Sequence, residues 1–316
     1  MGIAHNGSKI AGIVHGPHKL SGLAHAGKII YRSIPKLLTA KREWSYVIDY
    51  PVYAVDVNSI GEAMVGGANG DVILIAQDQS NQWATKYISA VRALAYDDQG
   101  NIFLSNITGY IGKYDTNLNQ VWSNKILDRY SVAMDIDPDG NAVVGTLTGQ
   151  SVQKVSSDGE LLWTTVLGAA IKSVGCASDG SVFVGVEGKL TKLDSGGTES
   201  WTHEVSGSFR NIAVTKDAVW VATHKTLYKY DQDGNLLLTL TDVGINPLLT
   251  VSHSDQIYLV SHTSSNTTQY KRLDKNGDSV WSLETQVVAA PSVFSVGGHD
   301  LYAVFADNTL ERVSEN

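Results

Sequence analysis

Cysteine is almost absent from this sequence, which has a single one, Cys176, among 316 residues. One thiol excludes a disulfide within the chain and a zinc site built from paired cysteines, and it is typical of a reducing compartment. Long apolar runs are also missing, so we expect no transmembrane helix. Gly, His and Lys interrupt every short apolar stretch of residues 1–32, which leaves no segment of the kind that a signal peptide needs.

Positive charge is scarce and unevenly placed. The chain has 24 Lys and Arg against 32 Asp and Glu, a net charge of −8, which excludes a general nucleic-acid binder. We therefore expect neither a specific nucleic-acid partner nor a membrane partner. Residues 1–42 carry seven basic residues and no acid, so this segment is basic and the remainder is acidic. Such an arm either folds onto its own body or docks on another acidic surface.

The basic arm is itself a repeat of ten residues, GIAHNGSKIA from Gly2, GIVHGPHKLS from Gly12 and GLAHAGKIIY from Gly22. Short apolar runs between Gly and Pro turns predict small strands that need stacking or a partner chain for stability. The aligned histidines are either a metal-binding or pH-sensitive stack, or packing positions. The candidate anchoring residues of the arm are His5, Lys9, His15, Lys19, His25 and Lys28.

The rest of the chain has a second repeat, marked by tryptophan. The recurring residues are Trp44, Trp83, Trp122, Trp163, Trp201 and Trp281, at intervals of 38 to 41 residues with one double interval. In the middle of the double interval, DGNLLLTL places Leu238 where DGELLWTT has Trp163. The body therefore has seven units of about 40 residues. Burying an indole stabilises a unit by roughly 1.5–3 kcal/mol, so the unit with Leu238 is expected to be the weakest.

Each unit contains four short runs rich in apolar, β-branched and aromatic residues, with polar turns such as DDQGN (97–101) and DPDGN (137–141) between them. Four antiparallel strands per unit predict an all-β fold, a seven-bladed β-propeller. A tryptophan strand at 42–48 precedes the first complete unit, and no such strand follows Thr309–Val313. We expect the N-terminal strand to pair there as the outer strand of the last blade and close the ring. The predicted domains are an arm (1–32), a linker (33–42) and the propeller (43–316).

The spacing Asp-x-x-Gly-x-x-x-Trp occurs at 194–201 and 274–281, with looser versions at 115–122 and 78–83. It resembles the tryptophan-docking repeat of quinoprotein-type, pyrroloquinoline-quinone-like propellers. The resemblance implies that this segment spans the third and fourth strands and staples adjacent blades, which gives the six tryptophans a structural docking role. Enzymes of that family use a calcium-bound quinone. Because vicinal cysteines and an acidic calcium cluster are missing from this sequence, we expect no cofactor.

The segment AGKIIYRS (26–33) and the pattern His-x-Gly-x-Lys-Ile resemble the N-terminal repeats of minor structural proteins of tailed bacteriophages. This resemblance implies a virion component assembled in the cytoplasm of a bacterial host. The leading hypothesis is a non-enzymatic, homo-oligomeric virion protein of the tail or a fibre. Its arm would bind other virion proteins, and its propeller would be displayed for attachment to host-surface carbohydrate or protein.

Two other functions stay open: a cytoplasmic scaffold or sensor propeller with a protein partner, and a polysaccharide-active enzyme at the propeller channel. Catalytic motifs such as GxSxG and HExxH are missing, so the sequence predicts no catalytic residue and no metal site. Cys176, in an apolar inner strand, is predicted to be an inert core thiol. His253 and His262 flank the strand IYLV (257–260), either as ligands or as surface turn residues.

Overall fold

The computed structural model describes residues 39–316, except 80, 87–88, 128–129, 265 and 316, together with six two-residue strands nearer the N-terminus. Side chains are described within 39–316, except at these positions and at 46 and 81–86. The chain divides into two compact units, residues 1–39 and 40–316, which are described separately. No helix in the described part of the chain has the length and hydropathy that crossing a bilayer requires.

In the first unit the described strands form three antiparallel pairs, β1 with β2, β3 with β6 and β4 with β5. Their bounds are β1 Ala4–His5, β2 Ser8–Lys9, β3 Leu20–Ser21, β4 Ala24–His25, β5 Lys28–Ile29 and β6 Arg32–Ser33. Four of the candidate arm residues, His5, Lys9, His25 and Lys28, lie in these strands. The other two, His15 and Lys19, lie outside the described residues.

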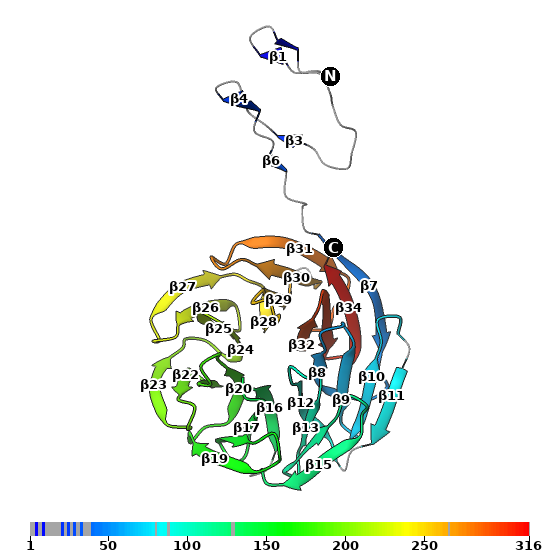
Figure 1. Cartoon of the computed structure of the whole chain (residues 1–316), viewed down its shortest axis with the longest axis vertical. Helices are drawn as coiled ribbons and strands as arrows, with labels where there is room; N and C mark the ends of the chain where they lie inside the picture. The colour runs from blue at the N-terminus through cyan, green and yellow to red at the C-terminus, as the bar shows by residue number, and fades with distance from the viewer. Residues whose placement is uncertain are drawn as a thin grey trace. The chain divides into compact units, whose positions relative to one another are not determined.

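The second unit consists of seven four-stranded antiparallel sheets around a central axis (Figure 1), which confirms the predicted seven-bladed β-propeller. The innermost strands are β8 Val52–Val57, β12 Val91–Tyr96, β16 Ser131–Ile136, β20 Ile171–Cys176, β24 Phe209–Thr215, β28 Ile245–Val251 and β32 Pro291–Gly297. The second strands are β9 Ala63–Gly67, β13 Ile102–Asn106, β17 Ala142–Thr146, β21 Val182–Val186, β25 Ala218–Thr223, β29 Ile257–His262 and β33 Asp300–Phe305.

The third strands are β10 Asp71–Ile75, β14 Tyr110–Tyr114, β18 Ser151–Val155, β22 Lys189–Leu193, β26 Thr226–Asp231, β30 Thr268–Leu273 and β34 Thr309–Glu315. The outer strands are β11 Asn81–Lys86, β15 Gln120–Lys125, β19 Leu161–Val166, β23 Glu199–Glu204, β27 Leu236–Thr241, β31 Ser279–Thr285 and, from the N-terminal side, β7 Ala40–Val47. Second strands are buried almost throughout because both of their faces meet neighbouring blades, whereas outer strands alternate between exposed and half-buried residues. This burial explains why the inner runs are continuously apolar.

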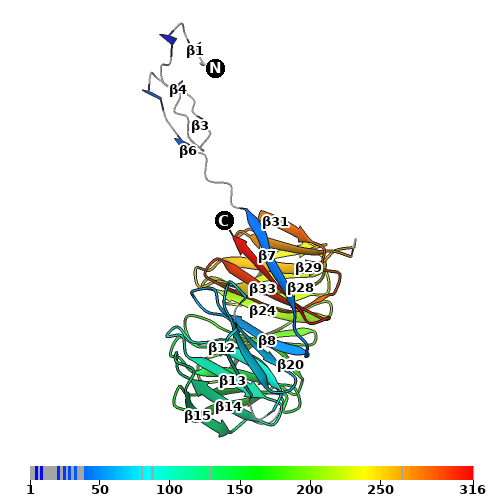
Figure 2. The ribbon, with the colours of Figure 1, turned by 90° about the vertical axis from the view of Figure 1, so that its right-hand side faces the viewer.

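Strand β7 completes the last blade by pairing antiparallel with β34, and both views of the ribbon show the two side by side (Figure 2). The pairing runs from Thr309 opposite Val47 to Glu315 opposite Ala40, as the sequence predicts. Buried Glu311 of β34 accepts hydrogen bonds from the Tyr270 hydroxyl at 2.7 Å and the Thr285 hydroxyl at 3.0 Å. The same carboxylate pairs with Arg42 of β7 at 2.5 Å. Polar contacts as well as backbone pairing therefore hold the closing strand.

Indole groups connect four of the blades to the next one. The Nε1–H of Trp122 donates to the Ser157 carbonyl at 2.9 Å, and the indole of Trp163 donates to the Ser195 carbonyl at 3.0 Å. Trp201 and Trp44 make the same bond to the carbonyls of Gln232 and Gln77. Each acceptor lies in the turn between the third and fourth strands of the following blade. The side chain of Trp83 lies outside the described residues.

The remaining parts of the repeat build the turn that receives the indole. In the turn after β22, the Asp194 carboxylate accepts the N–H groups of Gly196 and Thr198. Gly197 has φ +85°, and a Cβ there would overlap the Trp163 ring of the preceding blade. Glycine therefore supplies both the left-handed backbone and the bare surface on which the indole rests. This combination gives the Asp-x-x-Gly spacing its physical reason.

Two blades depart from this pattern. The Nε1–H of Trp281 is buried and has no hydrogen-bond partner among the described residues. In the next blade the third and fourth strands, β34 and β7, are not consecutive in sequence, so no hairpin turn joins them to supply an acceptor. At Leu238, which has no N–H to donate, the Lys229 ammonium donates to the carbonyl of Lys275 at 2.6 Å. The blade that has leucine in place of the docking tryptophan therefore keeps a polar link to its neighbour.

Candidate active site in the central channel

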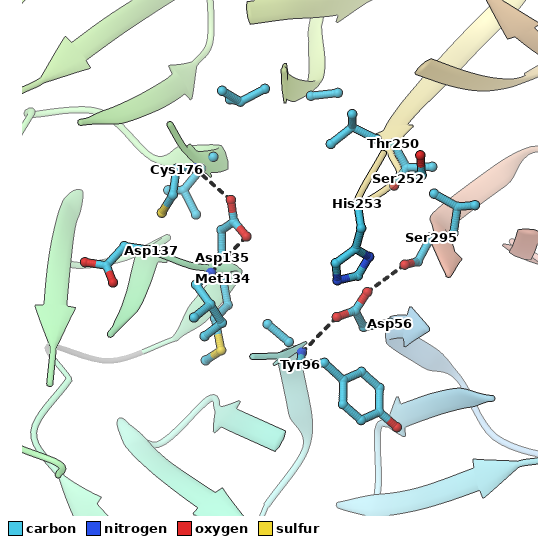
Figure 3. A pocket seen from close by; sticks show the side chains of 18 of the residues that line it. Asp56, Tyr96, Met134, Asp135, Asp137, Cys176, Thr250, Ser252, His253 and Ser295 are labelled. Carbon is cyan, nitrogen blue, oxygen red and sulfur yellow. Dashed lines mark hydrogen bonds between the residues drawn. The ribbon is translucent and has the colours of Figure 1, made fainter. Parts of the chain in front are cut away.

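A cavity of about 680 Å³ occupies the central channel, at the end toward which the inner strands run. The inner strands of all seven blades line it, together with the turns that follow five of them, and Figure 3 shows part of this lining. Because consecutive strands of a propeller surround one axis, residues far apart in the sequence meet here. The cavity is large enough for a small-molecule ligand.

Strand register places one residue of each inner strand at a common height in the cavity wall. These residues are Asp56, Ala95, Asp135, Gly175, Ala213, Thr250 and Ser295, which pair with corresponding positions of the second strands. Two are carboxylates, two are hydroxyls and three are small. We call this set the carboxylate level. The small residues leave open space beside the two acids.

Asp56 is held by the two blades on either side of its own. Its carboxylate accepts the Tyr96 backbone N–H at 2.9 Å from the following blade and the Ser295 hydroxyl at 2.6 Å from the preceding one. Burial raises the pKa of Asp56, while these two hydrogen bonds and the nearby His253 oppose that effect. Figure 3 shows the His253 imidazole directed toward this carboxylate. Burial prevails, so the pKa of Asp56 lies above its usual value, although the groups that contact the carboxylate favour its ionised form.

Asp135 has a different environment. Its carboxylate accepts the backbone N–H of Cys176 at 2.7 Å and that of Ile136 at 2.8 Å. Burial raises the pKa of Asp135 to about 6, and the negative charges of Asp56 and Asp137 add to the increase. No cation is among the groups that oppose it. Asp135 is only half-buried, so a ligand in the channel can reach this exchangeable proton.

The turns that follow the inner strands add further carboxylates at the mouth. Asp137 points away from the channel (Figure 3) and pairs with Lys154 at 2.5 Å. Burial tends to raise the pKa of Asp137, but the hydrogen bonds from Lys154 and Asn141 prevail and lower it. Asp137 is therefore a structural anion, whereas Asp56 and Asp135 face the cavity.

The sequence did not single out Asp56 or Asp135. One signal was available, because each is an isolated acid at the same place in an apolar inner run, AVDV from Ala54 and AMDID from Ala133. Cys176 lies in an inner strand as expected, but it lines the cavity and is half-buried. Burial, reinforced by the Asp135 charge, raises the pKa of the thiol well above its usual value. This thiol is therefore a poor nucleophile.

The two histidines weighed from sequence are not brought together as a pair. His253 follows β28 on an exposed turn at the cavity, and His262 ends β29 with its Nε2 at 3.4 Å from Asn266 Oδ1. Within the described part of the chain, no group of three or more His, Cys, Asp or Glu side chains is arranged to hold a metal ion. The channel residues therefore do not fit the calcium-bound quinone of the quinoprotein enzymes.

These features define a seven-bladed β-propeller with tryptophan-docked blades and an acidic central cavity. Residues 148–314, slightly more than half of the chain, match the PQQ-like repeat family whose description is "Outer membrane protein assembly factor BamB". The chain belongs to this family, which confirms the resemblance of the propeller body to PQQ-type repeats. No curated protein sequence matches the chain significantly.

Several solved structures have the same fold. Selenomethionine-substituted virginiamycin B lyase from Staphylococcus aureus has a TM-score of 0.72 at 12% identity, covering 87% of this chain and 99% of the lyase chain. A structure of streptogramin B lyase has a TM-score of 0.73 at 13% identity, covering 88% and 98%. A catalytically inactive variant of the S. aureus lyase with quinupristin gives 0.72 at 11% identity, covering 88% and 99%. At such identities the likeness shows the fold alone.

These comparisons correct two predictions. The chain was predicted to be a non-enzymatic virion protein of a tailed bacteriophage, and this prediction is wrong, because the similar solved structures are lyases and no matched protein reported above is a virion component. The prediction depended on a short repeat in the arm and on the lack of a local catalytic motif, and neither is specific enough to determine function. A propeller assembles its channel from distant strands, so a local motif is not required for catalysis.

Proposed function

We propose that this protein is a lyase whose acid–base chemistry takes place in the central channel. The observation that carries the proposal is the pair of channel carboxylates, Asp56 and Asp135, held in different environments in one cavity wall. An elimination needs a base that removes a proton from carbon and an acid that protonates the leaving oxygen. The lyase fold neighbours support this reaction class.

The environments assign the roles. Asp56 accepts hydrogen bonds from Tyr96 and Ser295 and faces His253, three groups that favour a carboxylate, so we assign it the role of the base. Asp135 lies near two other carboxylates and has a pKa of about 6, so below that pH it carries the proton and we assign it the role of the acid. In the step, Asp56 takes the proton as the C–H bond breaks, a C=C bond forms, the C–O bond breaks, and the leaving oxygen receives the proton of Asp135. Atoms and electrons balance without water, metal or redox partner.

The test is turnover of two candidate substrates by the purified full chain. Quinupristin is one probe, because a lyase of this fold is solved with it, and a uronate-containing polysaccharide is the other. Mass spectrometry detects an unsaturated product. We expect Asp135→Asn and Asp56→Asn each to lower kcat at least ~100-fold. The matched control is Asp139→Asn, a change at an exposed residue of the mouth, which should keep activity within about twofold.

Two results would contradict the proposal: no turnover of either substrate by the wild-type chain, or equal turnover by the wild type and Asp135→Asn. The pH profile adds a further condition. Because the reaction requires protonated Asp135, kcat should decrease as the pH rises through about 6.

A further inference from the structure

The starts of the inner strands, away from the cavity, carry an unusual set of cations. The second residue of each inner strand lies where the register with the second strand shifts. Around the ring these residues are Tyr53, Arg92, Val132, Lys172, Arg210, Asn246 and Ser292. We call this set the cationic level, because it has three cations and no acid. It precedes the carboxylate level by three residues in six of the seven strands, or ~10 Å.

Arg92 is fixed by two aromatic rings. Its guanidinium carbon lies 4.0 Å from the centroid of the Tyr53 ring and 4.9 Å from that of the Tyr130 ring. Tyr53 belongs to the preceding blade and Tyr130 to the start of the following one, so Arg92 contacts both blades that flank its own. None of the described carboxylates forms an ion pair with Arg92. With two aromatic neighbours and no described carboxylate in an ion pair, the guanidinium can still donate its N–H groups to an anion.

Arg210 is an uncompensated charge. Its Nε–H is buried and has no hydrogen-bond partner among the residues that the structure describes, and no ion pair with a described carboxylate involves it. Burial lowers the pKa of this guanidinium, since no nearby anion favours the charged form. Partial burial of a charge that has no partner is unfavourable, and a bound anion would remove much of that cost.

Lys172, the third cation of the level, is only loosely engaged. Its Nζ lies 3.8 Å from Glu187, and both side chains are well exposed to solvent. Glu187 also accepts the backbone N–H of Phe209. The nearby carboxylate is therefore tied to the backbone and to the lysine, and it leaves the two arginines without an anion.

We propose that Arg92, Lys172 and Arg210 form a binding site for an oxyanion, a carboxylate or phosphate group carried by a small ligand. Arginine recognises both groups through paired N–H donors. This site goes beyond the proposed function, because binding of an anion at the cationic level requires no chemistry at the carboxylate level.

Isothermal titration calorimetry of the full chain tests the site with two probes, inorganic phosphate and trigalacturonate, and with maltotriose as the uncharged control. The two probes distinguish a phosphate from a sugar carboxylate. We expect one of them to bind, and Arg210→Gln to weaken that binding at least ~10-fold. Lys189→Gln is the matched control, because it removes the same charge from an exposed residue that pairs with Glu204 at 3.5 Å. Its affinity should stay within about twofold.

A stability measurement excludes a merely structural role for Arg210. Because the half-buried guanidinium has no ion pair with a described carboxylate, Arg210→Gln should leave the urea midpoint of the free protein unchanged or raise it. Three outcomes would overturn the proposal. The first is that neither anion binds at about 10 mM, a concentration that would reveal even very weak affinity. The second is equal weakening of binding by Arg210→Gln and Lys189→Gln, and the third is a large loss of stability in Arg210→Gln. None of these readouts involves turnover, so they leave the lyase proposal to its own test.

Discussion

Replacing Asp135 by asparagine should stabilise the propeller at neutral pH, although it removes a group from the proposed active site. The pKa of this carboxyl is about 6 in the folded protein, against 3.8 for an unperturbed Asp. A carboxyl with a raised folded pKa contributes fully to stability below the unfolded pKa, and that contribution is lost as the pH rises through the folded pKa. A shift of about two units at roughly 1.4 kcal/mol per unit costs the wild type about 3 kcal/mol near pH 7.5.

The asparagine variant does not titrate, so it escapes this cost. Its amide can accept only one of the two backbone N–H groups, from Cys176 or Ile136, that the carboxylate accepts. That loss is about 1 kcal/mol and is independent of pH. Urea unfolding of both proteins between about pH 4 and about pH 7.5 should therefore show a stability difference that moves in favour of the variant by about 2–3 kcal/mol as the pH rises.

Asp137→Asn is the matched control, because the pKa of Asp137 is shifted in the opposite direction from that of Asp135. Asp137 pairs with Lys154, and its pKa lies below the usual value despite burial. Its contribution is present above the unfolded pKa and is lost as the pH falls, so the control should be less stable than the wild type near neutral pH. A stability difference for Asp135→Asn that does not change with pH would refute the reasoning about the channel. So would a pH trend of the same sign in both variants.

Two further predictions concern the docking of the blades and the closing of the ring. In urea unfolding, Trp163→Leu should lower the free energy of unfolding by about 1–3 kcal/mol, because the indole hydrogen bond and apolar contact are lost. The fold should persist, since Leu238 occupies the same place in another blade. A change below ~0.5 kcal/mol would contradict the docking role. Glu311→Gln should cost about 1–3 kcal/mol by weakening the contacts to Arg42, Tyr270 and Thr285, and hydrogen exchange should show the loss first in β7; uniform protection across all blades would speak against it.

The features of the fold that the sequence predicts are those determined by residues close together in the chain. The 40-residue period, the turn residues and the tryptophans predicted seven blades, and the phase of the repeat predicted that β7 pairs with β34. Each blade needs only its own strands and its two neighbours, which repeat the same pattern, so a sequence window of one repeat contains most of what determines it. The sequence did not predict that the Trp281 indole lacks a hydrogen-bond acceptor, because this lack results from the way the ring closes.

The sequence by itself therefore determined the kind of fold, the number of blades and the strand that closes the ring. Only the tertiary structure decided the chemistry of the channel, since Asp56 and Asp135 lie two blades apart in the chain and meet in one cavity. A pKa depends on burial and on neighbouring charges, and these neighbours come from strands that are far apart in sequence. The same reason applies to Arg92 and Arg210, which the linear order separates and the common axis of the ring brings to one level.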